Sequence, residues 1–214
     1  GRPNVGKSSL LNAFLGTKIS IVSAIPQTTR YQVRGIYNLP NAQIVFVDTP
    51  GIHSFSDTLT VQLNTVAKNA SDGCDVIVYM VDVTRRVGKE ERQIMDFLTR
   101  INNKIPVVMA FNKIDCGSKF IPEYIKTWES VAQKRSPDKE NPPIIYYVPV
   151  SARTGKNLDK LRELILEHIP QASAFYDTRT STDLPQQFRI ADLIREKLFL
   201  QLTQELPHSL AVEV

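Results

Sequence analysis

The stretch that decides the fold is Gly1-Arg2-Pro3-Asn4-Val5-Gly6-Lys7-Ser8, which fits the phosphate-loop pattern G-x-x-x-x-G-K-[ST]. Glycine has no Cβ and tolerates positive φ, so the backbone of such a loop can approach phosphate oxygens closely. Lys7 places a cation on the outer phosphates, and the Ser8 hydroxyl is a candidate Mg²⁺ ligand. The residues predicted to cradle the phosphates are Gly1, Asn4, Val5, Gly6, Lys7, Ser8 and Ser9.

A helix is predicted directly after this loop, over SSLLNAFLG at 8–16. Leu10, Leu11 and Phe14 fall on one side of that helix, and Gly16 is a typical residue for its end. The positive end of the helix dipole would therefore add to the phosphate cradle.

Composition narrows the class of protein. The chain has 214 residues, of which 42% are hydrophobic, and its net charge is +4. No run of about 18 apolar residues is present, so no segment is predicted to span a bilayer. The two cysteines, Cys74 and Cys116, suggest neither a disulfide framework nor a metal site. The mild positive charge is compatible with RNA or anionic membranes without indicating either.

Apolar runs of strand length alternate with segments of helical spacing. Strands are predicted at 31–39, 42–51, 74–83, 106–115 and 143–152, and helices at 89–101, 122–134 and 157–170. This alternation predicts an α/β fold with a largely parallel sheet buried between flanking helices. Because ligands sit beyond the carboxyl ends of parallel strands, the polar turns DTPG, NKID and SAR are expected to converge at one edge.

The domain organisation follows from a change in composition. Residues 1–170 form the predicted main domain, and 171–186 form a linker rich in Ser, Thr, Asp and Pro. Residues 187–214 hold one helix, with Ile190, Ala191, Ile194, Leu198 and Leu202 on a single face, followed by the start of a strand at 208–214. The chain is therefore expected to be cut from a longer protein at both ends.

The turn Asp48-Thr49-Pro50-Gly51 ends a predicted strand about forty residues after Lys7. Asp48 would hold Mg²⁺ through water as the acidic partner of Ser8, and the Gly51 N–H would contact the terminal phosphate. Between the first helix and the next strand, Gln27-Thr28-Thr29-Arg30 offers a further Mg²⁺ ligand. Thr29 is favoured for this role, and Thr28 stays open.

The segment Asn112-Lys113-Ile114-Asp115 predicts the base. The Asp115 carboxylate can accept hydrogen bonds from N1–H and the exocyclic amine of guanine, whereas adenine has no donor at N1. Asn112 would tie neighbouring loops together, and the aliphatic stem of Lys113 would cover the base plane. Ser151 and Ala152 would close the pocket with backbone N–H groups aimed at the guanine carbonyl. The predicted substrate is GTP with Mg²⁺.

In this order, GRPNVGKS, QTTR, DTPGIH, NKID and VSA, followed by IREKL and ELPHSLAVEV, resemble the Era family of Ras-like GTPases over essentially the whole chain. The resemblance implies a P-loop GTPase domain followed by an α+β type II KH RNA-binding domain, of which only the N-terminal part is present. It implies a GTPase that binds 16S-type ribosomal RNA and assists assembly of the small ribosomal subunit. The expected oligomeric state is a monomer. It also implies a bacterial cytoplasmic protein with peripheral contact at the inner membrane, or an organellar one in a eukaryote.

The predicted chemistry has one unusual feature, since the position that carries the water-orienting glutamine in Ras-like enzymes is Ile52. Isoleucine cannot hydrogen-bond water, so either intrinsic hydrolysis is slow or another group positions the attacking water. Lys7, Thr29 and Gly51 are the predicted catalytic residues. Asn4 is a candidate K⁺ ligand, because related GTPases with asparagine at this position use K⁺ in place of an arginine finger. Catalytic roles for Arg30 and His53 are the less favoured interpretations.

Three alternatives to this function remain at the level of sequence. The first is a related GTPase acting in tRNA modification or large-subunit assembly, against which the IREKL and ELPHS segments argue. The second is a nucleotide-binding module without turnover, against which the set of Lys7, Ser8 and Asp48 argues. The third is an ATPase or kinase, which would leave NKID unexplained.

Overall fold

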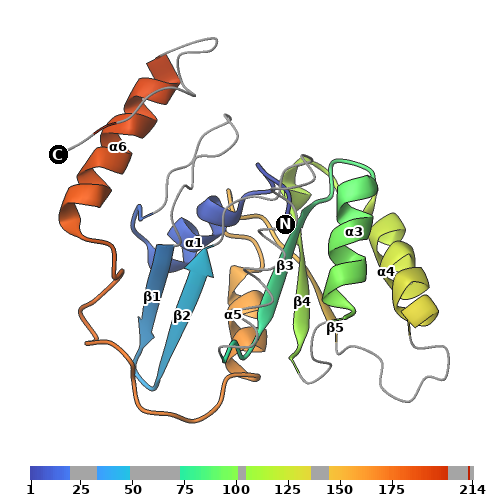
Figure 1. Cartoon of the computed structure of the whole chain (residues 1–214), viewed down its shortest axis with the longest axis horizontal. Coiled ribbons are helices and arrows are strands. Elements are labelled where there is room, and N and C mark those ends of the chain that lie inside the picture. Colours follow the sequence, from blue (N-terminus) through green and yellow to red (C-terminus); the bar gives the residue numbers. More distant parts are fainter. Residues whose placement is uncertain (20–32, 49–72, 101–104, 136–144, 202–211, 213–214) are drawn as a thin grey trace. The chain divides into compact units, whose positions relative to one another are not determined.

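The computed structural model describes residues 1–19, 33–48, 73–100, 105–135, 145–201 and 212 (Figure 1). The chain divides into two compact units. The first unit holds Gly1–Val5 and the segment Ile52–Gln171, and the second holds Gly6–Gly51 and Ala172–Val214. Each unit has its own sheet.

Among its described residues, the first unit has three parallel strands in the order β3-β4-β5: Ile77–Asp82, Val107–Asn112 and Ile145–Pro149. The register aligns Asp82 with Asn112 and Phe111 with Pro149. All six residues of β4 are buried, as expected for the central strand of a sheet covered on both faces. The carboxyl ends of the three strands therefore lie at one edge, which is the ligand-binding edge of such sheets.

Helices cover both faces of this sheet (Figure 1). On one face α3 (Lys89–Leu98) and α4 (Ile121–Arg135) pack together, and α5 (Leu158–Leu166) lies on the other. A short 3₁₀ turn, Ile114–Cys116, follows β4 directly. The core beneath α3 and α4 combines alternate strand residues with apolar helix residues: Tyr79, Val81, Val83, Val87, Ile94, Met95, Leu98, Val107, Met109, Phe111, Tyr124 and Trp128.

The second unit begins with α1 (Lys7–Leu15), which packs on an antiparallel hairpin of β1 (Val33–Leu39) and β2 (Ala42–Asp48). Phe14 of the helix stacks on Phe46 with ring centroids 5.1 Å apart. Gly16 ends α1 in the left-handed conformation at φ 62°. The predicted helix, its buried face of Leu10, Leu11 and Phe14, and its glycine stop are confirmed.

Residues 175–184 run along β1 before α6 (Gln186–Gln201) begins. The Ile36 N–H donates to the Ser181 carbonyl at 2.9 Å, and Gly35 forms an antiparallel bridge with Thr182. The Asn38 side chain donates to the Thr180 carbonyl at 2.8 Å, and Arg34 pairs with Asp183 at 3.0 Å. The segment from 175 to 184, called the strap below, is thus held to the hairpin.

Two expectations differ from the observed strands and helices. The strand at 42–51 was expected to be buried, but in β2 only Ile44 is fully buried and Val47 is 39% exposed. The reason is that β2 belongs to an antiparallel hairpin, whose residues alternate between two unlike faces. On α6, Ile190 and Ile194 of the expected apolar face are 39% and 42% exposed. Within the described residues no helix is both long and apolar enough for a bilayer.

Candidate functional site: a guanine-nucleotide pocket

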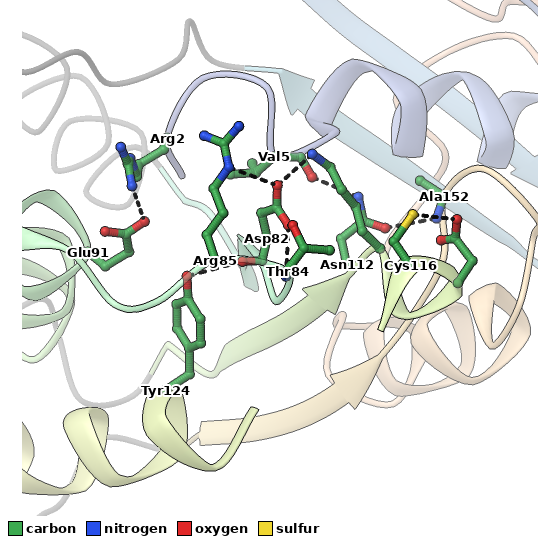
Figure 2. A network of polar contacts seen from close by, with 12 residues as sticks. Arg2, Val5, Asp82, Thr84, Arg85, Glu91, Asn112, Cys116, Tyr124 and Ala152 are labelled. Carbon is green, nitrogen blue, oxygen red and sulfur yellow. Dashed lines mark hydrogen bonds and ion pairs between the residues drawn. The ribbon is translucent and has the colours of Figure 1, made fainter. Parts of the chain in front are cut away.

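The first glycine of the phosphate loop lies against the backbone of β3. A Cβ on Gly1 would stand 2.3 Å from the Met80 carbonyl oxygen, which no side chain could tolerate. Next to it, Arg2 pairs with Glu90 at 2.5 Å, at the N-terminus of α3. Arg2 also pairs with Glu91 at 2.9 Å (Figure 2). Glu91 is buried and also accepts a hydrogen bond from the Gly88 N–H at 2.8 Å. The sheet and α3 therefore fix the start of the loop.

The end of the loop needs unusual backbone angles. Gly6 has φ 100°, and Asn4 has φ 59°, a left-handed conformation that asparagine tolerates better than most residues. Glycine is thus required at the two positions for different reasons. Gly1 lies too close to the backbone of β3 for a Cβ, and Gly6 has a positive φ. Helix α1 begins at Lys7, which puts Ser8 and Ser9 in the first helical turn, where unpaired backbone N–H groups favour anions.

Asn112, at the end of β4, joins the phosphate loop to the segment after β5. Its side-chain Nδ2 donates to the Val5 carbonyl at 2.7 Å, and its Oδ1 accepts from the Ala152 N–H at 2.9 Å (Figure 2). Asn112 is only 3% exposed, so both bonds are shielded from water. This bridging is the part that the sequence predicts for Asn112, and all three residues belong to the first unit.

The Asp115 carboxylate is oriented by three neighbours. The Ser151 hydroxyl donates to it at 2.6 Å, the Arg153 guanidinium lies at 2.9 Å, and the Cys116 thiol donates at 3.3 Å. The hydrogen bond from Ser151 is the main cause that lowers the pKa of Asp115 below its ordinary value. Asp115 is therefore an ionised acceptor, as recognition of the guanine N1–H and amine requires.

The segment 150–152 differs in detail from its expected role. The N–H groups of Val150, Ser151 and Ala152 donate within the protein, to the carbonyls of Phe111 at 2.8 Å and Lys156 at 3.1 Å and to Asn112 Oδ1. In this structure the segment braces Asn112 and Asp115. Its contact with the guanine carbonyl stays a prediction.

Sequence reasoning missed Asp82, the last residue of β3. It is 6% exposed and accepts a hydrogen bond from Lys113 Nζ at 2.6 Å. Thr84 donates to its other oxygen from both the backbone N–H, at 3.0 Å, and the hydroxyl, at 2.6 Å. The sequence does carry a signal for Asp82, because this aspartate stands at the end of the apolar strand 77–82. A polar residue at the end of an apolar strand is also the pattern of DTPG and NKID.

Of the other predicted residues, Lys7, Ser8, Ser9 and Asp48 belong to the second unit, where Asp48 is the last residue of β2. The convergence expected for the strand-end turns is observed for NKID and SAR, which meet through Asn112–Ala152 and Asp115–Ser151. The remaining predictions lie outside the described residues: Gln27, Thr28, Thr29, Arg30, Gly51, Ile52, His53, the last residue of the helix expected at 89–101, most of the DTPG turn, and all but Val212 of the strand expected at 208–214.

Comparison with known proteins adds independent evidence. Residues 1–113 match the model of a family described as 50S ribosome-binding GTPase. The whole chain aligns with GTPase Era of Geobacter metallireducens at 40% identity and with GTPase Era of Halothermothrix orenii at 41%. It covers 68% and 69% of the length of these two relatives.

Solved structures give the same picture. A crystal structure of Era in complex with MgGDPNP and nucleotides 1506–1542 of 16S ribosomal RNA is 34% identical, with a TM-score of 0.81. Aquifex aeolicus Era bound to GDP and AlF4⁻ is also 34% identical, with a TM-score of 0.78. Both alignments cover 98% of this chain and 68% of the solved one.

Proposed function

The chain belongs to the Era family of GTPases, and from that premise we propose that it is a GTP-driven switch that binds 16S-type ribosomal RNA and assists small-subunit assembly. The P-loop GTPase fold and the GTPase class, both predicted from sequence, follow from family membership. The observation that carries the proposal is the bridge of Asn112 between the phosphate loop and the 150–152 segment, with Asp115 held beside it.

Base recognition falls to Asp115, with Asn112, Lys113, Ser151 and Ala152 around it. An ionised carboxylate pairs with the N1–H and the amine of guanine, and adenine leaves the same carboxylate unmet. Because Ser151 orients Asp115 from a fully buried position, the acceptor is held in place before the nucleotide arrives. Selectivity for guanine then needs no rearrangement of this part of the pocket.

Phosphate binding falls to the loop from Gly1 to Ser9. Gly1, Asn4, Val5 and Gly6 supply backbone N–H groups, and Lys7 and the dipole of α1 supply positive charge. Lys7, with Thr29 and Gly51, would act on the transferred phosphoryl group, because charge stabilisation and positioning account for most of the catalysis in this reaction class.

The proposed metal is Mg²⁺, held by Ser8, Asp48 and Thr29. Ser8 lies in the first turn of α1 and Asp48 ends β2, both within the second unit. A hydroxyl and a carboxylate are hard oxygen ligands of the kind that Mg²⁺ prefers, so the residues fit the ion. Bound Mg²⁺ would neutralise charge on the phosphates, and Thr28 remains the alternative to Thr29.

K⁺ is proposed as a second cation beside Asn4. The amide oxygen of asparagine is a suitable ligand for such an ion, and Ile52 cannot orient the attacking water. Turnover of GTP by the full chain is expected to be faster in KCl than in NaCl at equal ionic strength. Equal rates in the two salts would remove K⁺ from the mechanism.

The RNA partner is proposed from the Era complex with 16S ribosomal RNA. RNA would bind through a KH domain, of which residues 187–214 would be the N-terminal part. The alternative is a related GTPase acting in tRNA modification or on the large subunit, and the phrase "50S ribosome-binding" in the family description favours its large-subunit form. Binding of the complete protein to labelled 16S and 23S fragments decides between the two subunits. Preference for a 23S fragment would support the large-subunit alternative.

Family membership also suggests a monomeric protein of the bacterial cytoplasm with peripheral contact at the inner membrane, or an organellar protein in a eukaryote. Sedimentation of the purified protein tests the monomer. Recovery of the protein in the membrane fraction after cell lysis, and its release by salt, tests the peripheral contact.

The decisive experiment replaces the base-reading acid. Asp115→Asn exchanges an acceptor pair for one acceptor and one donor, so affinity for GTP should fall by at least about a hundredfold. The same variant should gain affinity for xanthosine triphosphate, whose ring offers the complementary pattern. Asp159→Asn, at an exposed acid of α5, is the matched control and should bind GTP normally. Unchanged GTP affinity in Asp115→Asn would refute the proposed base site.

A further inference from the structure

Asp82 lies at the base-binding edge without any predicted contact to the nucleotide. It ends β3 and is aligned with Asn112 of β4, so it stands beside the strand that leads into the base-recognition segment. Its side chain is 7% exposed, and the ion pair with Lys113 is the only one below 3.5 Å that it makes among the described residues. Arg85, the second cation, is exposed and stands 3.9 Å away.

Asp82 is held through both its carboxylate and its backbone carbonyl. One oxygen accepts both the N–H and the hydroxyl of Thr84, and the backbone carbonyl of Asp82 accepts from the buried Tyr124 hydroxyl at 3.2 Å (Figure 2). The second oxygen is left for Lys113 Nζ at 2.6 Å. The Asp82 carboxylate is therefore fixed in position, and one of its oxygens accepts from the long and flexible side chain of Lys113.

Lys113 needs such an anchor. Its backbone is left-handed at φ 70°, directly after β4, and its side chain is one-third exposed. A lysine side chain moves among many rotamers, and this freedom is lost when its stem lies over a base. An acceptor that already holds the ammonium restricts the stem before binding and so lowers the entropy lost on binding.

We propose that Asp82 is a positioning residue for guanine-nucleotide binding, because it holds the Lys113 side chain in the conformation that covers the base. The inference rests on the proposed function, since it takes Lys113 to be part of the base pocket. It extends the nucleotide site to the end of β3. In this role Asp82 would act through Lys113 and not through its own contact with the nucleotide.

The test uses the full chain and measures the dissociation rate of fluorescently labelled GDP. Asp82→Asn keeps the shape of the side chain and its bonds to Thr84 but loses the ion pair, so GDP should dissociate about tenfold faster. Asp96→Asn is the matched control, because it breaks the Asp96–Arg100 pair on the exposed face of α3. That variant should release GDP at the normal rate.

A double-mutant cycle separates positioning from a structural effect. Lys113→Met keeps the aliphatic stem and removes the ammonium, so adding Asp82→Asn to it should change the dissociation rate by less than about twofold. Effects that multiply in the double variant would overturn the proposal. So would a Asp82→Asn variant that unfolds more easily but releases GDP at the normal rate, or one that binds GDP more tightly.

Two further measurements keep the test decisive. If Asp82→Asn fails to fold, Thr84→Val removes one hydrogen bond to Asp82 while leaving the ion pair, and it should speed release about threefold. An unchanged rate there would count against the proposal. The Asp115→Asn experiment reports separately on the base site, and the proposed function fails if guanine selectivity survives that change. If the effects of Asp82→Asn and Lys113→Met on the dissociation rate are independent of each other, only the positioning role of Asp82 is refuted.

Discussion

Ser151 is the residue on which the geometry of Asp115 depends most directly. It is fully buried, and its hydroxyl donates to the Asp115 carboxylate at 2.6 Å. We predict that Ser151→Ala weakens GDP binding by about tenfold, because a hydrogen bond to a charged group is lost and only Arg153 and Cys116 still orient the acceptor. Equilibrium titration with labelled GDP measures the change, and Ser118→Ala, at an exposed serine after the same turn, is the control.

The same change has a pH signature. The hydrogen bond from Ser151 lowers the pKa of Asp115. In the native protein the carboxylate therefore stays ionised even when the pH falls below the ordinary pKa of an aspartate. Without the hydroxyl the pKa should rise, and GDP affinity should begin to fall at a higher pH than in the native protein. An acid limb at the same pH in both proteins would show that Ser151 does not set the charge of Asp115.

Sequence could predict these residues only in part. Asn112 and Asp115 stand in a motif whose spacing implies their chemistry, whereas Ser151 belongs to a three-residue segment that is common by chance. That the serine acts through its hydroxyl rather than its backbone N–H depends on how closely β4 and β5 align, with Phe111 opposite Pro149. Register of this kind arises from packing between distant segments and is not encoded in either segment alone.

At the scale of elements, the strap shows how a segment that resembles a linker can be an ordered part of a unit. Gln43 of β2 holds it with both side-chain atoms: Oε1 accepts from the N–H groups of Phe175 and Tyr176 at 2.9 and 3.0 Å, and Nε2 donates to the Tyr176 carbonyl at 2.9 Å. Nε2 also donates to Asn38 Oδ1 at 2.7 Å. Residues of both β1 and β2 therefore hold the strap.

We predict that Gln43→Ala loosens the strap locally. Three hydrogen bonds to its backbone disappear, so amide exchange in residues 175–180 should accelerate about tenfold or more, while the core strands of the first unit stay protected. Hydrogen exchange followed by mass spectrometry measures this. Gln171→Ala, at an exposed glutamine just before the second unit resumes, should leave the exchange pattern unchanged. Equal exchange in both variants would show that Gln43 does not hold the strap.

The strap was not predicted because the contacts that attach it to the hairpin do not depend on a periodic pattern of apolar residues. Strands β3 to β5 appear in the sequence as continuous apolar runs, since a strand covered on both faces has no polar side. Residues 175–184 are held instead by backbone groups and by the amide side chains of Asn38 and Gln43. Such contacts leave no periodic trace, and composition alone classifies the segment as a linker.

At the scale of the whole molecule, the proposed nucleotide site combines segments that are far apart in the chain. In the first unit the phosphate loop, the end of β3, the end of β4 and the turn after β5 are joined by side-chain hydrogen bonds, and each bond uses a polar residue at the end of an apolar strand. Stability and binding therefore share the same groups, and Asp82 is the clearest case.

The last prediction concerns acid stability. Burial alone would raise the pKa of Asp82, but hydrogen bonds from Lys113 and Thr84 outweigh it, and the net pKa lies below the ordinary value. The unfolded chain then takes up a proton at higher pH than the native protein does. The stabilisation by Asp82 is therefore complete above the ordinary pKa and is lost as the pH falls through the lowered one.

We accordingly predict that Asp82→Asn, which cannot titrate, is less stable than the native protein by an amount that is constant from neutral pH to about pH 5 and shrinks below about pH 4. Urea unfolding followed by the fluorescence of Trp128 measures this difference, because Trp128 is the single tryptophan and lies in the same core as β3. Asp96→Asn, which breaks an exposed pair, should differ little from the native protein at any pH. A difference for Asp82→Asn that does not change with pH would mean that the ion pair with Lys113 does not govern its ionisation.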